Sequence, residues 1–158
     1  MRLRNVLIAG SLASWSFIGL AGPASAAPTK VGTETFVLTS DINAEGGVVT
    51  ASGVINDQGV DIVMSDTQDT FDFGANGQIT VFHSPLRSQD KFSQKKCSFS
   101  FTEKGTYVFG NGTGEWAGYN GSGTYTAKGQ AVDACGDAPV GTVTITAKGP
   151  INPPAADE

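Results

Sequence analysis

The sequence predicts an all-β protein, a single closed antiparallel β-barrel of about eight strands that follows an N-terminal signal peptide. From residue 27 onward, apolar and polar residues alternate with a period of two, which is typical of strands with one buried face. Segments rich in Thr, Val, Phe and Tyr are separated by Gly and Asn, which favour turns. No stretch of this region has the pattern of an amphipathic helix.

The first 26 residues have the features of a secretory signal peptide. Arg2 and Arg4 give a positive start, residues 6–22 are apolar or small, and Ala24-Ser25-Ala26 is a small-x-small cleavage site. We therefore expect cleavage after Ala26 and a secreted, extracellular protein without a membrane or lipid anchor.

The expected mature chain has the size of one domain and an acidic balance. It keeps 8 of the 10 Lys and Arg residues and all 15 Asp and Glu residues, which gives a net charge of −7. This charge disfavours nucleic acid and anionic membrane surfaces as partners. The predicted organisation is a signal peptide at 1–26, a β-barrel domain at 27–149 and a disordered, proline-rich and acidic tail at 150–158.

Cys97 and Cys135 are the two cysteines of the chain. In an oxidising compartment such a pair normally forms a disulfide, although two unpaired buried thiols are the alternative. A bridge across this spacing would stabilise the fold by about 4 kcal/mol through loop closure. Neither cysteine has a Cys-x-x-Cys or Cys-x-x-His neighbour, so no metal site is predicted there.

Strand character recurs along the whole expected domain. Asn76-Gly77 and Asn111-Gly112 can take the positive φ of tight hairpin turns. Eight or nine strands are expected, at 33–40, 47–55, 59–65, 70–74, 78–84, 96–103, 106–109, 121–132 and 140–148.

The apolar faces of these strands must be buried together. Ser and Thr alternate with Cys97, Phe99 and Phe101, and Thr alternates with Val143, Ile145 and Ala147. A sandwich and a barrel both bury such faces, and we favour the barrel because closure leaves no unpaired edge. A barrel of about eight strands is just wide enough to be filled by side chains or to hold one small ligand.

Residues 110–125 contain the densest motif of the chain, with glycine at almost every second or third position. Its core consists of Gly112, Thr113, Gly114, Trp116, Gly118, Gly121 and Gly123. Glycines at this spacing indicate close backbone approach, a bulge or a sharply coiled barrel corner. They do not match a phosphate-binding fingerprint.

This segment resembles the Gly-Thr-Gly-x-aromatic-x-Gly-x-x-Gly-x-Gly motif of the allene oxide cyclase and dirigent barrel superfamily, especially its bacterial secreted members. The resemblance implies an eight-stranded antiparallel barrel with a ligand-holding lumen, often assembled as a homo-trimer. Plant relatives cyclise a fatty-acid epoxide or steer the radical coupling of phenols. Glu115 and Tyr119-Asn120 depart from the usual pattern, so the resemblance implies the fold and not a particular reaction.

Aromatic residues are the candidate ligand contacts. Tyr and Trp could line an apolar pocket and aim a polar tip at a ligand, whereas the same rings could simply fill the barrel. The predicted ligand-binding residues are Phe99, Phe101, Tyr107, Trp116 and Tyr125.

Titratable residues give weaker signals. His83 is the only histidine and has no Gly-x-Ser-x-Gly partner, so a catalytic triad is not predicted. Asp66, Asp69 and Asp72 are spaced by three rather than by the two of a calcium loop. Basic residues gather in an expected surface loop that contains Arg87, Lys91, Lys95 and Lys96. We predict no cofactor and no metal.

Three functions stay open at this level. The first is binding of a small apolar or phenolic ligand in the lumen, favoured because no catalytic set is visible. The second is an isomerase or cyclase of the allene oxide cyclase type, which would need a buried carboxylate such as Glu103 or Asp72. The third is a structural or interaction protein of the cell envelope.

Overall fold

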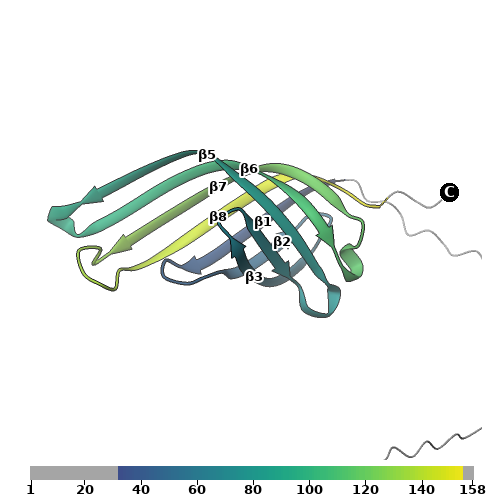
Figure 1. Ribbon diagram of the computed structural model, residues 1–158, viewed down its shortest axis with the longest axis horizontal. Helices are drawn as coiled ribbons and strands as arrows, with labels where there is room; N and C mark the ends of the chain where they lie inside the picture. The colour runs from purple at the N-terminus through teal and green to yellow at the C-terminus, as the bar shows by residue number, and fades with distance from the viewer. Residues whose placement is uncertain (1–31, 155–158) are drawn as a thin grey trace, which may run out of the picture.

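The computed structural model describes residues 32–154, which form a closed antiparallel barrel of eight strands (Figure 1). The strands pair in sequence order, and β8 closes the barrel on β1. The strands are β1 Gly32–Asp41, β2 Gly47–Ser52, β3 Asp57–Ser65, β4 Gln68–Asp72, β5 Gln78–Ser93, β6 Ser98–Gly112, β7 Asn120–Val132 and β8 Val140–Asn152. Three short 3₁₀ turns lie between strands, η1 Gly74–Asn76, η2 Gln94–Lys96 and η3 Gly114–Trp116.

The predicted fold class is confirmed, and the alternation of the sequence explains it. Inward and outward residues alternate along β7 and β8, where the Thr residues face solvent and the small or apolar residues face inward. The predicted signal peptide at 1–26 lies outside the described residues. Within residues 32–154, no helix is long and apolar enough to cross a membrane.

Side chains fill one end of the barrel. The ring of Phe36 packs on those of Phe71 and Phe109, at centroid distances of 5.3 and 5.5 Å. Trp116 of η3 packs edge-on against Phe73, at 6.2 Å, and both are buried. Any ligand must therefore enter from the other end, because this closed end has a packed aromatic core.

The other end is open because the strands differ in length. β4 pairs with β5 from Gln78 to Phe82, whereas β5 continues to Ser93 and pairs with β6 throughout. Residues 84–93, 98–106, 124–132 and 140–146 of β5–β8 thus extend beyond the short β2–β4 strands as a curved sheet, visible at the left of Figure 1. We call this part the projecting sheet.

Two expectations for β5 and β6 were wrong. The basic segment predicted as a loop is mostly strand, since Arg87 and Lys91 lie in β5 and only Lys95 and Lys96 lie in the η2 turn. The segments 96–103 and 106–109 form one continuous strand, β6. The polar composition of this part of β5 gave no indication of a strand. It is a strand because it pairs with β6.

The expected boundary at residue 149 was also wrong. β8 runs to Asn152, with Pro150 opposite Thr33 and Ile151 opposite Gly32 on β1. Ile151 is completely buried in the closed end. Proline is tolerated here because the pairing of β8 with β7 is interrupted between Lys148 and Ile151, so no ladder donor is needed on that side. Residues 155–158 of the predicted tail lie outside the described residues.

The two predicted hairpin turns, Asn76-Gly77 and Asn111-Gly112, differ from each other. Gly77 has φ of +115°, as expected for a turn residue between β4 and β5. Asn111-Gly112 instead ends β6, and a longer connection containing η3 leads to β7.

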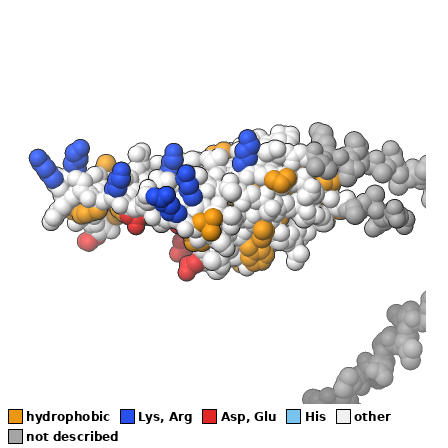
Figure 2. Space-filling model, turned by 90° about the horizontal axis from the view of Figure 1, so that it is seen from above, with side chains coloured by type: hydrophobic (Ala, Val, Ile, Leu, Met, Phe, Trp, Pro, Cys, Tyr) orange, Lys and Arg blue, Asp and Glu red, His pale blue; other side chains and the backbone are white. Residues whose placement is uncertain are grey.

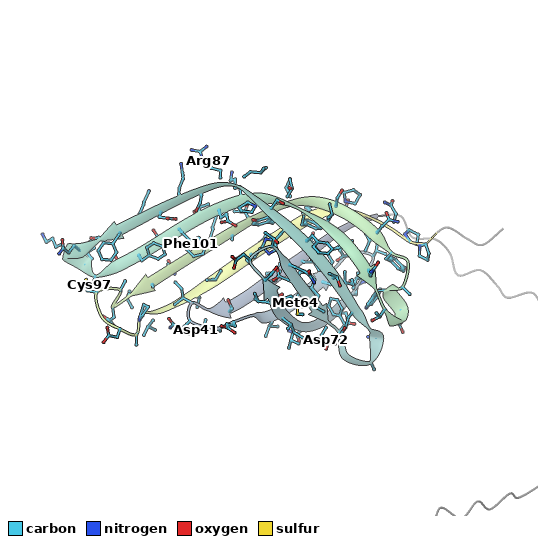
Figure 3. All side chains as sticks on the ribbon, viewed as in Figure 1. Asp41, Met64, Asp72, Arg87, Cys97 and Phe101 are labelled. Carbon is cyan, nitrogen blue, oxygen red and sulfur yellow. A yellow bond between two sulfur atoms is a disulfide. The ribbon has the colours of Figure 1, made fainter. Side chains whose placement is uncertain are left out.

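The predicted disulfide between Cys97 and Cys135 is confirmed, with Cα atoms 5.0 Å apart. Cys97 follows η2 at the tip of the β5–β6 hairpin, and Cys135 lies in the connection between β7 and β8. The bridge therefore ties together the two hairpins that end the projecting sheet (Figure 3).

Candidate functional site

A cavity of about 280 Å³ lies where the packed core gives way to the open end. Its walls come from seven of the eight strands and are mainly apolar. The lining residues are Leu38, Asp61, Val63, Ser65, Asp66, Asp69, Phe71, Val81, His83, Glu103, Tyr125, Ala127, Ile145 and Ala147. Val63 and Asp66 are exposed, so the cavity opens to solvent on the side of the β3–β4 hairpin.

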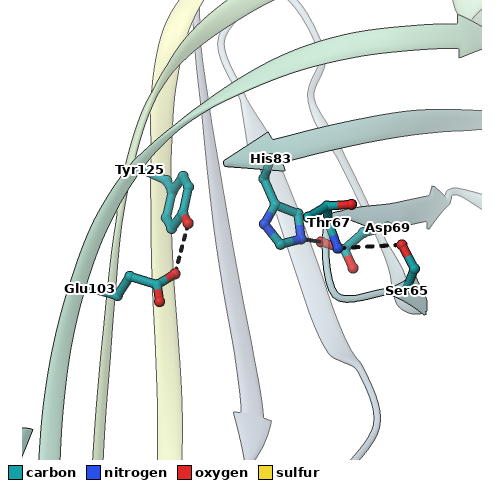
Figure 4. A network of polar contacts seen from close by, with 6 residues as sticks. All are labelled: Ser65, Thr67, Asp69, His83, Glu103 and Tyr125. Carbon is teal, nitrogen blue, oxygen red and sulfur yellow. Dashed lines mark hydrogen bonds and ion pairs between the residues drawn. The ribbon is translucent and has the colours of Figure 1, made fainter. Parts of the chain in front are cut away.

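His83 and Asp69 make a polar contact on one wall of the cavity, with His83 Nε2 3.2 Å from Asp69 Oδ2 (Figure 4). The backbone N–H of His83 donates to the carbonyl oxygen of Thr67 at 3.0 Å, which holds the β3–β4 turn against β5. The imidazole also packs edge-on against the ring of Tyr125, at 5.9 Å. The contacts with Asp69 and Tyr125 thus fix the orientation of the His83 ring.

Tyr125 and Glu103 form the second polar pair of the cavity. The Tyr125 hydroxyl donates to Glu103 Oε1 at 2.7 Å (Figure 4). Burial raises the pKa of Tyr125, and the hydrogen bond to Glu103 raises it further. A Cβ at Gly105 would collide with the Tyr125 ring and with the Ser84 carbonyl oxygen, so glycine is needed for the ring to lie there.

Asp61 is the least satisfied polar residue of the cavity. Its Oδ1 is buried and has no hydrogen-bond partner among the described residues. Burial, with a smaller contribution from the charge of Asp69, raises the pKa of Asp61 to about 7. Burial also raises the pKa of Asp69, while the neighbouring His83 lowers it in part. Asp61 can therefore hold or release a proton near neutral pH.

This arrangement can place a hydrogen-bonding group of a ligand beside an apolar body. Phe71, Val81 and Ala147 form apolar walls, and Asp61, His83 and Glu103 supply polar atoms. No hydrogen bond joins the His83 ring to a Ser or Thr hydroxyl in the described chain. Residues 32–154 also contain no cluster of three His, Cys, Asp or Glu side chains suited to a metal ion.

The predicted ligand residues fall into three places. Tyr125 lines the cavity. Tyr107 and Trp116 are buried in the core of the closed end, where the Tyr107 hydroxyl and the Trp116 Nε1 have no described partner. Phe99 and Phe101 lie on the projecting sheet, outside the cavity. The structure therefore does not bring the five together.

The glycine motif builds the closed end rather than the cavity. Gly114 and Gly118 have φ of +60° and +77° in the connection around η3. A Cβ at Gly121 or Gly123 would collide with neighbouring backbone and with the rings of Phe109 or Tyr107. Thr113 Oγ1 accepts a hydrogen bond from the backbone N–H of Gln78 at 3.0 Å, which ties this connection to β5. The motif is thus a packing device.

Sequence reasoning missed Asp61 and Asp69 as members of the site. One signal could have found Asp61, because it occupies an inward position of β3 between Gly59 and Val63, where an apolar residue is expected. Asp69 and His83 carry no such signal, since they meet only through the pairing of β4 with β5.

Comparisons with known proteins assign no relative. No family model, no curated protein and no solved structure matches this chain. The resemblance to the allene oxide cyclase and dirigent barrel superfamily therefore stays a prediction.

Proposed function

We propose that this protein is a ligand-binding barrel whose cavity takes a small apolar molecule with one hydroxyl group, such as a phenol. The supporting observation is a mainly apolar cavity at the open end into which a few fixed polar groups converge. Binding sites for small molecules typically combine an apolar lining with a few polar groups that orient the ligand.

The polar groups of the cavity suit a hydroxyl rather than an anion. The unpaired Oδ1 of Asp61 can accept a hydrogen bond from a phenol or alcohol. Asp66, Asp69 and Glu103 add further carboxylates, which repel a negatively charged ligand. Aromatic rings such as Phe71 and Tyr125 give a phenol stacking partners.

Isothermal titration calorimetry with a panel of neutral phenols tests this proposal. Ala127→Phe would fill the cavity from a buried position on β7, whereas Val108→Phe adds the same ring on the exposed outer face of β6. We expect binding by the wild type and Val108→Phe, and at least tenfold weaker binding by Ala127→Phe. No binding across the panel, or equal affinity in all three proteins, would refute the cavity as the site.

An isomerase or cyclase is a second candidate, because the cavity holds ionisable groups. Asp61, with its pKa raised to about 7, has the proton affinity of a general acid or base at neutral pH. In this version Asp61→Asn binds the substrate and loses turnover. If Asp61→Asn turns over a substrate at the wild-type rate, Asp61 is not the acid or base.

Export and assembly are part of the proposal. The signal peptide and the disulfide support an extracellular location, where disulfides persist. The homo-trimer rests on the family resemblance alone. A purely structural role for the barrel is less favoured because the open end is hollow.

A further inference from the structure

Beyond the cavity, apolar side chains and glycines continue along the inner face of β6–β8 as a strip that we call the groove. Inward residues succeed one another every two positions, so Glu103 is followed by Phe101 and Phe99 on β6. Ala127 is followed in the same way by Gly129 and Ala131 on β7, and Ile145 by Val143 on β8. Beyond the cavity, the inward residues of these three strands are all apolar or glycine, as far as Phe99 on β6, Ala131 on β7 and Val143 on β8.

The groove ends in a second hollow of about 230 Å³ near the tip of the projecting sheet. Ile42, Phe92, Phe99, Ala131, Ala134 and Pro139 line it. The rings of Phe99 and Phe101 lie 6.0 Å apart and form the floor between the two hollows. At about 3.3 Å per residue, the path from Glu103 to Phe99 spans roughly 13 Å.

The two faces of the projecting sheet differ in character. Phe92 is directly opposite Phe99 and therefore on the inner face, where it remains 57% exposed. Arg87 and Lys104, also directly opposite each other, lie on the outer face, and Figure 3 shows Arg87 pointing away from the barrel. Figure 2 shows Lys and Arg side chains gathered along one side of the molecule and Asp and Glu along the other. The exposed Phe92 therefore lies beside Phe99 on the inner face, with Ser88 and Asp90 on the same face of β5.

The chemistry of the groove favours a hydrocarbon chain as its occupant. The inner side chains of β6–β8 offer no hydrogen-bond donor or acceptor between Glu103 and the tip. On β5, Ser88 and Asp90 lie opposite Glu103 and Phe101 and give the groove one polar side. The backbone groups of β6 and β7 are paired with neighbouring strands. A peptide pressed against this surface would leave its own N–H and C=O groups unpaired on that side. An alkyl chain has no such groups.

We propose that the cavity and the groove bind one elongated neutral amphiphile, with its hydroxyl-bearing head in the cavity and its alkyl chain along the groove. This inference rests on the proposed function and names its ligand class. A compact phenol would occupy the cavity alone, whereas an alkylphenol would also cover Phe101, Phe99 and Phe92.

A series of 4-alkylphenols of increasing chain length, titrated by calorimetry into the full secreted chain, tests the inference. Full burial of a methylene raises affinity about fourfold, so a groove that covers one side of the chain should raise it about twofold per methylene. We expect this increase to continue beyond the chain length that the cavity alone can hold.

Phe92→Ser is the decisive variant because its ring is exposed and not needed for the core. We expect this variant to bind the short alkylphenols with wild-type affinity and to lose the gain in affinity that longer chains give. Phe99→Ser should behave in the same way. Phe82→Ser removes a 44% exposed ring from the same strand, outside both hollows, and should keep the full increase.

Three results would overturn the inference in distinguishable ways. An affinity plateau beyond the short members, equal in wild type and Phe92→Ser, would show that the chain leaves the protein at the cavity. A dimer in light scattering that Phe92→Ser dissociates would assign the groove to a second copy. Failure of even the short phenols to bind would refute the proposed function itself.

Discussion

Replacing Asp61 with Asn should make the protein more stable at pH 8 and leave it unchanged at pH 4. Burial raises the pKa of this carboxyl from 3.8 to about 7. Between these values the folded protein keeps a proton that the unfolded chain has lost, so the contribution of Asp61 to stability falls as pH rises. Asn has nearly the shape of the protonated acid and carries no charge at any pH.

The rise of this pKa from 3.8 to about 7 corresponds to about 4 kcal/mol. Because the cavity is open to solvent, we halve this value to about 2 kcal/mol. The advantage of Asp61→Asn should grow from pH 4 to pH 7, with a slope of at most about 1.4 kcal/mol per pH unit, and then level off.

Urea denaturation of the oxidised protein at pH 4, 6 and 8 measures this difference. For an m-value of about 1–3 kcal/mol per molar, 2 kcal/mol moves the midpoint by roughly 1 M. Asp137→Asn, in the exposed β7–β8 connection, is the matched control and should show no growing advantage. If Asp61→Asn is equal to or less stable than wild type at pH 8, Asp61 is not a desolvated carboxyl and the description of the cavity fails.

Three further predictions concern the framework of the site. Reduction of the Cys97–Cys135 bridge should lower the free energy of unfolding by about 4 kcal/mol, and a reductant should not affect the double Ser variant in the same urea assay. Glu34 is completely buried and accepts hydrogen bonds from the backbone N–H groups of Thr35 and Ile55 at 3.2 and 2.8 Å. Glu34→Ala should therefore lower the free energy of unfolding by roughly 1–3 kcal/mol in the same assay, and Glu34→Gln should lower it less. Gly105→Ala should cost roughly 1–3 kcal/mol in thermal unfolding because its Cβ would displace the Tyr125 ring; an unchanged Tm would contradict the close packing.

The fold could be predicted from the sequence because its main signal is local. The alternation of Thr with Val143, Ile145 and Ala147 repeats around the barrel, and the burial pattern of β8 follows it. The projecting part of β5 could not be predicted, because Arg87, Gln89 and Lys91 have no apolar pattern of their own. Their pairing with β6 makes them a strand.

The site was less predictable, because it depends on which strands meet. Aromatic content pointed to Tyr107, Trp116 and Tyr125 alike, yet only Tyr125 lies at the boundary between the core and the open end. That boundary is set by the shortness of β4 relative to β5. The pairing of His83 with Asp69 depends on the same register, which no local pattern encodes.

Nuclear Overhauser effects between a bound short alkylphenol and the methyl groups of the protein test the central claim most directly, because they locate the ligand. Effects to the methyls of Leu38, Ala127 and Ile145, which line the cavity, are the predicted result. Effects to the exposed methyls of Val108 or Val132 instead, or none at saturating ligand, would contradict it.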